Sequence, residues 1–174
     1  MIILVGPSAS GKTEIGKVLN KYGFKKLVTY TTRDKRINEI EGIDYHFINK
    51  DRFKNLIDEN FFFEYVLYND NYYGTSNESI RNDVYVILEP NGLLKYKNRE
   101  DTVSFYIEVD EQTLKTRMIN RKDKAEDIVK RLTGDKFVFT NEVKESCDYV
   151  LDGTKSLEEL ANFIVLKVKE HGLH

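Results

Sequence analysis

The chain has 174 residues, which suits one domain with small inserted lobes and a hydrophobic core of useful size. Its net charge of -2 argues against a broad surface for nucleic acid or anionic membranes, and its single cysteine, Cys147, excludes a disulfide framework or a cysteine zinc site. The apolar stretches fall well short of the ~20 residues that span a bilayer, and the apolar N-terminus leaves no room for a signal peptide, so we expect a cytoplasmic protein.

The first predicted elements are a buried strand over residues 2–5 and a helix over residues 12–22. The loop between them reads G-P-S-A-S-G-K-T, which fits the phosphate-loop pattern G-x-x-x-x-G-K-[ST]. In such a loop the backbone N–H groups surround a phosphate, Lys12 supplies charge for the outer phosphates, and the Thr13 hydroxyl is placed to hold Mg²⁺. A chance Gly/Ser-rich turn is the alternative. The strand, loop and helix occur in the required order and favour a nucleoside triphosphate site. The expected contacts are Gly6, Ser8, Ala9, Ser10, Gly11, Lys12 and Thr13.

Strands and helices alternate along most of the remaining chain. Further strands are predicted over residues 26–30, 84–88, 103–109 and 149–151. Helices are predicted over 49–60, from the N-cap Asp110 to about 121, over 125–139, and after the capping box of Ser156 and Glu159. This order predicts an α/β fold of the P-loop NTPase type, with a parallel sheet covered by helices on both faces.

Residues 33–80 interrupt the alternation. They are rich in aromatic residues, with short strand signals at 45–48 and 61–68 and a predicted turn at 69–71. We therefore expect a small β-rich lobe inserted in the core. Ligands bind beyond the carboxyl ends of the strands in such sheets, so the lobe is placed to form a wall of a second site.

A candidate second anion site follows the strand at 26–30. Arg33 and Arg36 come after a run of hydroxyl residues, and the planar guanidinium group binds phosphate oxygens in pairs. On these residues alone, a solvated basic loop is an equal alternative. The chain continues E-I-E-G-I-D-Y-H-F over 39–47, F-F-E-Y over 62–65 and N-Y-Y-G-T over 71–75.

Together these runs resemble guanylate kinase, a family that transfers the γ-phosphate of ATP to GMP or dGMP. The resemblance implies that Arg33, Arg36, Tyr45 and Tyr73 hold the GMP phosphate. Glu64 would accept hydrogen bonds from guanine N1–H and the 2-amino group, which adenine lacks. Thr75 would face the O6/N7 edge of the base, with Thr29 nearby.

The resemblance also implies a mobile lid over ATP. Arg117 and Arg121 lie four residues apart on one predicted helix, and Arg131 lies on the next, so that all three could neutralise the transferring phosphoryl group. An exposed helix with ordinary charges is the alternative. The implied division is a core of about 1–32, 81–116 and 141–174, a GMP-binding lobe of about 33–80 and a lid of about 117–140.

The expected chemistry is direct in-line transfer, with Lys12, Arg33, Arg117, Arg121 and Arg131 as the catalytic residues. Mg²⁺ is the expected cofactor, and the expected partners are ATP with GMP or dGMP, without nucleic acid or membrane, in a monomer or homodimer. Two departures from the family pattern stand out. First, the family carries two carboxylates after the strand at 84–88, whereas this chain has only Glu89, which we expect at the GMP site. Second, the chain has D-G-T at 152–154 where the family often has N-D-D.

Three other functions remain in view. One is another nucleoside or deoxynucleoside monophosphate kinase. A second is a non-catalytic guanylate-kinase-like module that binds phosphopeptides, although such modules typically lose the phosphate loop. A third is a P-loop switch protein, which needs no second phosphate site.

Overall fold

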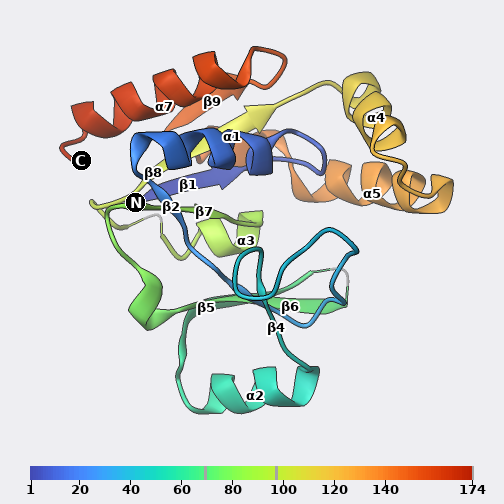
Figure 1. Ribbon diagram of the computed structural model, residues 1–174, viewed down its shortest axis with the longest axis vertical. Helices are drawn as coiled ribbons and strands as arrows, with labels where there is room; N and C mark the ends of the chain where they lie inside the picture. The colour runs from blue at the N-terminus through green and yellow to red at the C-terminus, as the bar shows by residue number, and fades with distance from the viewer. Residues whose placement is uncertain (69, 97, 174) are drawn as a thin grey trace.

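A computed structural model describes residues 1–68, 70–96 and 98–173, which contain two β-sheets (Figure 1). The larger sheet has five parallel strands in the order β2-β7-β1-β8-β9. These strands are β1 (Ile2–Val5), β2 (Lys25–Lys26), β7 (Val84–Ile87), β8 (Val103–Glu108) and β9 (Tyr149–Asp152). Because β1 lies at the centre, the loop that follows it emerges at the carboxyl edge, where ligands bind in open α/β sheets.

Helices cover both faces of the larger sheet. The helices are α1 (Lys12–Leu19), α2 (Lys50–Asp58), α3 (Pro90–Leu93), α4 (Glu111–Asn120), α5 (Ala125–Val138), α6 (Asn141–Glu145) and α7 (Leu157–Glu170). Ile2 and Leu4 of β1 pack in one apolar cluster with α1 and α7. Ile3 and Val5 point to the other face and pack with Leu93 of α3. Burial on both faces explains the continuous apolar run of β1 and confirms the α/β class.

The smaller sheet belongs to the inserted region and has the order β4-β3-β6-β5. Its strands are β3 (Tyr30–Thr31), β4 (His46–Phe47), β5 (Phe62–Tyr68) and β6 (Asn71–Ser76). Helix α2 packs against it through Phe53, whose ring stacks on Phe62 at 4.4 Å and on Tyr72 at 5.2 Å between centroids. These aromatic residues give the smaller sheet a core of its own, in the lower half of Figure 1.

The strand predicted over 26–30 is instead two short strands in different sheets. Lys26 pairs with β7 of the larger sheet, and Tyr30 pairs with β6 of the smaller one. The N–H of Leu27 still bonds to β7, whereas the carbonyl of Thr29 already accepts from β4. The chain therefore changes sheets between these two residues. Nothing in the local pattern marks the change, because the pairing partners are distant in sequence.

Helix starts predicted from capping residues are confirmed. The side chains of Asn49 and Asp110 accept backbone N–H bonds at the starts of α2 and α4, at 2.8 and 2.9 Å. Ser156 and Glu159 form the reciprocal capping box of α7. The predicted helix over 12–22 is α-helical to its residue 19 and ends in a 3-10 turn.

Other short elements differ from the predictions. The helices α3 and α6 were not predicted, because four or five residues show too little periodicity. Of the turn predicted at 69–71, Asn69 lies outside the described residues, and Asp70 has a positive φ of 61°.

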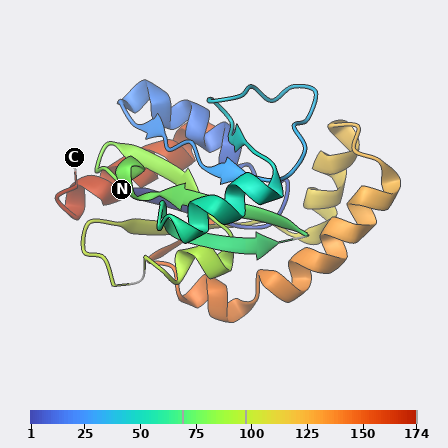
Figure 2. The same cartoon turned by 90° about the horizontal axis from the view of Figure 1, so that it is seen from below.

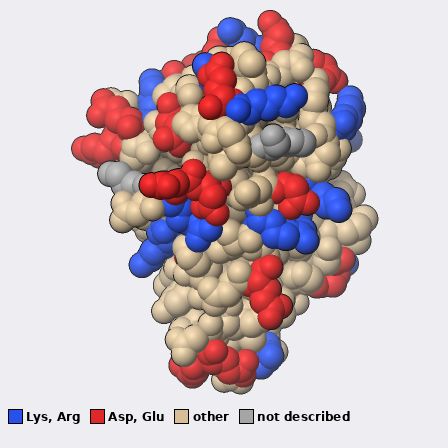
Figure 3. Space-filling model, turned by 90° about the vertical axis from the view of Figure 1, so that its left-hand side faces the viewer, with Lys and Arg blue, Asp and Glu red and all other residues tan. Residues whose placement is uncertain are grey.

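Helices α4 and α5 lie side by side at one end of the molecule in both Figure 1 and Figure 2, beside the carboxyl edge of the larger sheet. On the face in Figure 3, Lys and Arg are interspersed with Asp and Glu. Among the described residues, no helix is long and apolar enough to cross a membrane.

Candidate active site

The phosphate loop connects β1 to α1 and has a backbone suited to an anion. Gly6 and Gly11 have φ of 150° and 107°, and Ala9 has φ of 65°. A Cβ at position 6 would lie 2.7 Å from the carbonyl oxygen of Ile107, so the close approach requires glycine there. Left-handed residues within such a loop turn successive N–H groups inward, as in other anion-binding loops.

Lys12 is folded back onto this loop. Its Nζ donates to the carbonyl oxygens of Gly6 at 2.6 Å and Pro7 at 2.8 Å. Burial lowers the pKa of Lys12 to about 8, whereas the charges of Glu89 and Asp135 raise it. A phosphate placed here would favour the charged ammonium in the same way.

A cavity of about 440 Å³, here called the outer cavity, lies between the phosphate loop and the start of α7. Its lining includes residues 9–13 of the loop, Arg117, Arg121 and Gly153. The Arg117 guanidinium donates to the carbonyl oxygens of Ser10 at 3.0 Å and Gly153 at 2.7 Å. Arg117 therefore ties the loop to the end of β9, and it does not line the cavity that holds Arg33 and Arg36.

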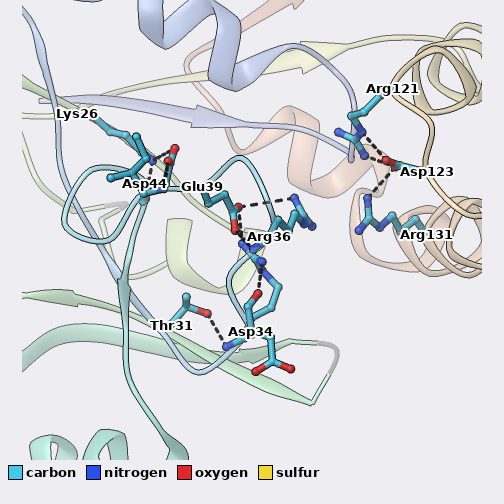
Figure 4. Close-up of polar contacts among 11 residues, drawn as sticks. Lys26, Thr31, Asp34, Arg36, Glu39, Asp44, Arg121, Asp123 and Arg131 are labelled. Atoms are coloured by element: carbon cyan, nitrogen blue, oxygen red, sulfur yellow. Dashed lines mark hydrogen bonds and ion pairs between the residues drawn. The ribbon is translucent and has the colours of Figure 1, made fainter.

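A second cavity, of about 330 Å³, lies between the loop, the smaller sheet and α5. Its lining includes Ser8, Ala9, Lys12, Thr13, Arg33, Arg36, Tyr45, Tyr73, Glu89, Arg121 and Arg131. Figure 4 shows Arg36 on one side, with Arg121 and Arg131 on the other. Burial lowers the pKa of Arg36, and the charges of Arg33, Arg131 and Arg121 lower it further. We call this second cavity the cationic cavity, because its lining gathers positive charges that a bound anion would neutralise.

Glu39 contacts both Arg33 and Arg36 in the loop that follows β3. Its Oε1 accepts from Arg33 Nη2 at 2.7 Å, and its Oε2 accepts from the backbone N–H of Arg36 at 2.8 Å. The carboxylate and the Arg33 side chain are both mostly buried, at 15% and 17% exposed. The pair therefore holds its geometry more firmly than an exposed ion pair would.

Glu64 of β5 and Thr75 of β6 form a buried pair in the smaller sheet. The Thr75 hydroxyl donates to Glu64 Oε1 at 2.5 Å, and both residues are buried. Burial raises the pKa of Glu64 to about 7, and the hydrogen bonds from Thr75 oppose the rise. A Cβ at Gly92 would lie 3.2 Å from Glu64 Oε2. Behind the pair, the buried hydroxyl of Tyr96 faces Thr75 and makes no hydrogen bond within the described residues.

A third cavity, of about 40 Å³, lies beside Glu64 and next to the cationic cavity. It is lined by Thr29, Glu64 and Gly92, and it shares Tyr45, Tyr73 and Glu89 with its larger neighbour. Burial raises the pKa of Tyr45 to about 12, so its hydroxyl remains a hydrogen-bond donor at neutral pH.

Arg121 and Arg131 converge on one carboxylate that was not predicted as part of the site. Asp123 accepts from Arg121 at 2.9 and 2.5 Å and from Arg131 at 3.0 Å. The pKa of Asp123 is lowered, mainly by the hydrogen bond from Arg121. An acid between two basic residues in a turn gives a weak sequence signal, because most such acids are solvated.

Glu89 points one carboxylate oxygen into a buried position without a partner. Its Oε2 has no hydrogen bond among the described residues. Burial raises the pKa of Glu89 to about 7, and the charge of Lys12 lowers it. Such an oxygen is costly unless a cation or donor reaches it.

A family model for guanylate kinase matches residues 1–165. The chain belongs to the guanylate kinase family. Among curated guanylate kinases, that of Clostridioides difficile is 31% identical over 98% of this chain and 96% of its own length. Those of Chlamydia muridarum and Mycoplasma genitalium are 31% and 36% identical over 75% of this chain, and the alignments span 68% and 60% of those proteins.

The crystal structure of guanylate kinase from Anaplasma phagocytophilum has the same fold. It superposes with a TM-score of 0.77 over 98% of this chain and 84% of that one, at 23% identity. Membership of the guanylate kinase family supports an enzyme that phosphorylates GMP with ATP, and it does not favour the other functions considered above.

One further buried acid of this guanylate kinase fold was not predicted. Asp135 of α5 accepts hydrogen bonds from both the phosphate loop and β5. It follows Ile128 and Leu132 at helical spacing, so a carboxyl group stands in an otherwise apolar stripe. That position is the sequence signal that could have identified it.

Proposed function

We propose that this chain transfers the γ-phosphoryl group of ATP to GMP or dGMP. The observation that carries the proposal is the single cavity lined by the phosphate loop on one side and by Arg33 and Arg36 on the other. Two anion-binding groups facing one space suit an in-line transfer between two phosphates. The acceptor phosphate is itself an anionic nucleophile, so no general base is required.

Each predicted residue has a role in this proposal. ATP would occupy the outer cavity beside Arg117, with its outer phosphates on residues 6–13. The GMP phosphate would contact Arg33, Arg36, Tyr45 and Tyr73, and the guanine would meet Glu64 and Thr75 beside Thr29. Arg121 and Arg131 would release Asp123, bind the transferring phosphoryl group in its place and neutralise the charge of that group. The same division proposes a core of 1–32, 81–116 and 141–174, a GMP-binding lobe of 33–80 and a lid of 117–140.

We propose Mg²⁺ as the cofactor. Thr13 lines both large cavities, and Glu89 offers a buried carboxylate oxygen without a partner. Oxygen ligands of this kind suit Mg²⁺, which keeps several waters and takes phosphate oxygens as well. Thr13 and Glu89 would hold the ion, whose positive charge would offset that of the ATP phosphates. Among the described residues, no group of three or more His, Cys, Asp or Glu could hold a metal alone.

A coupled assay of ADP formation with ATP and a panel of GMP, dGMP, AMP, UMP and TMP tests the proposal. We expect turnover with GMP and dGMP and very little with AMP. Strong AMP turnover would contradict the base-site assignment, and no turnover with any acceptor would contradict the kinase.

Lys12→Ala tests the partition into two sites. Turnover should fall by at least about 10²-fold, because a positioned charge on the phosphates is lost, while GMP binding measured by calorimetry should persist. Lys17→Ala is a matched control, since Lys17 is exposed on the same helix. If Lys12→Ala abolished GMP binding in a folded protein, the two sites would not be separate.

A further inference from the structure

Asp135 joins three parts of the molecule. It lies on α5 and is 4% exposed. Its Oδ2 accepts from the backbone N–H of Ser8 in the phosphate loop at 2.7 Å, and its Oδ1 accepts from the hydroxyl of Tyr68 at the end of β5 at 2.8 Å. One carboxyl group thus connects the phosphate loop, the smaller sheet and the helix that carries Arg131.

The two hydrogen bonds are short and directional. Each oxygen of the carboxyl group has its own donor, so rotation or translation of α5 by a fraction of a hydrogen-bond length would weaken both. The charge of Asp135 also raises the pKa of Lys12, against the larger lowering by burial. Asp135 does not line the cationic cavity, so it does not compete for the space between the two phosphate sites.

Arg131 lies one turn before Asp135 on the same face of α5. Its guanidinium lines the cationic cavity, and its side chain is 24% exposed. Fixing Asp135 against the loop therefore fixes the point from which Arg131 reaches the phosphates. A misplacement of about 1 Å at such a site can reduce turnover by ~10²-fold.

We propose that Asp135 is a positioning residue that clamps α5 to the phosphate loop and to Tyr68, and so sets Arg131 opposite the transferring phosphoryl group. This rests on the proposed function. Asp135 touches no substrate in this role. Because it acts through Arg131, its loss should lower the turnover rate more than it weakens the binding of either nucleotide.

Kinetics of Asp135→Ala and Asp135→Asn test the proposal, with Glu126→Gln as the control because Glu126 is an exposed acid on the same helix. Asp135→Ala should lower kcat by about 10- to 100-fold, with much smaller changes in the KM values for GMP and ATP. Asp135→Asn should recover most of the loss, because the amide oxygen accepts from Ser8 and the amide N–H donates to the Tyr68 oxygen.

A double-mutant cycle separates positioning from general stabilisation. In an Arg131→Ala background, Asp135→Ala should change kcat by less than about threefold, since the residue that it positions is gone. Full additivity of the two losses would overturn the proposal. So would a variant with wild-type kcat and only a lower melting temperature.

Hydrogen exchange gives a readout that does not depend on turnover. Asp135→Ala should speed exchange at the Ser8 amide and along residues 125–138, and Asp135→Asn should restore protection. Unchanged exchange in Asp135→Ala would overturn the clamp while leaving GMP turnover by the wild type intact. A wild-type protein that fails to phosphorylate GMP would instead overturn the proposed function, and the positioning role with it.

Discussion

Glu64→Gln tests the proposal that Glu64 recognises guanine. A carboxylate accepts from both adjacent guanine donors, whereas an amide accepts from one and turns its own N–H₂ toward the other. Losing a hydrogen bond to a charged group costs about 1.5–3 kcal/mol, and leaving a buried donor unpaired costs about 1–3 kcal/mol more. The expected fall in kcat/KM for GMP is therefore about 10²- to 10⁴-fold.

The pH dependence sharpens this test. Burial raises the pKa of Glu64 to about 7. If GMP needs the ionised form, that form is roughly one tenth of the protein at pH 6 and nine tenths at pH 8. The ratio of wild-type to Glu64→Gln kcat/KM should then rise about tenfold over this range. Taking the ratio cancels the titrations of the GMP phosphate and of Glu89.

The coupled assay at several pH values measures this ratio. Glu100→Gln, at an exposed acid, is the control. A ratio that stays constant from pH 6 to 8 would refute the titration argument, and a Glu64→Gln enzyme with wild-type kcat/KM would remove this residue from the base site. Stability offers a second readout. A carboxyl with a raised folded pKa keeps its proton in the folded state, so the unfolding free energy of the wild type should decrease relative to Glu64→Gln as pH rises from 4.5 toward 7.

Three further substitutions test the surrounding structure. Tyr96→Phe removes a buried hydroxyl without a hydrogen bond and should raise the unfolding free energy by about 1 kcal/mol in denaturant titrations; a loss would reveal a partner for it. Gly16→Ala should lower that free energy by about 1–3 kcal/mol, because its Cβ would collide with the Tyr85 ring, and wild-type stability would contradict this packing. Glu39→Gln should raise the KM for GMP about tenfold by loosening Arg33, as steady-state kinetics can measure; a change confined to the KM for ATP would place Glu39 elsewhere.

The features predicted correctly are those whose cause is local in sequence. The phosphate loop needs glycine where the backbone takes positive φ, and capping residues such as Asn49 and Ser156 bond to N–H groups only a few residues away. The resemblance added the proposed GMP-binding residues, whose role stays a prediction. The structure places Arg33 and Arg36 in the same cavity as Lys12.

The features that the sequence left open depend on partners far along the chain. The split of residues 26–30 between two sheets depends on pairing with β7 and β6, and the role of Asp135 depends on a loop amide 127 positions away. The sequence alone determined the chemistry of each binding group, because that chemistry is carried by side-chain type and short spacing. Only the tertiary structure decided which groups share one cavity and which hold the others in place, because those contacts exist only once distant segments have packed together.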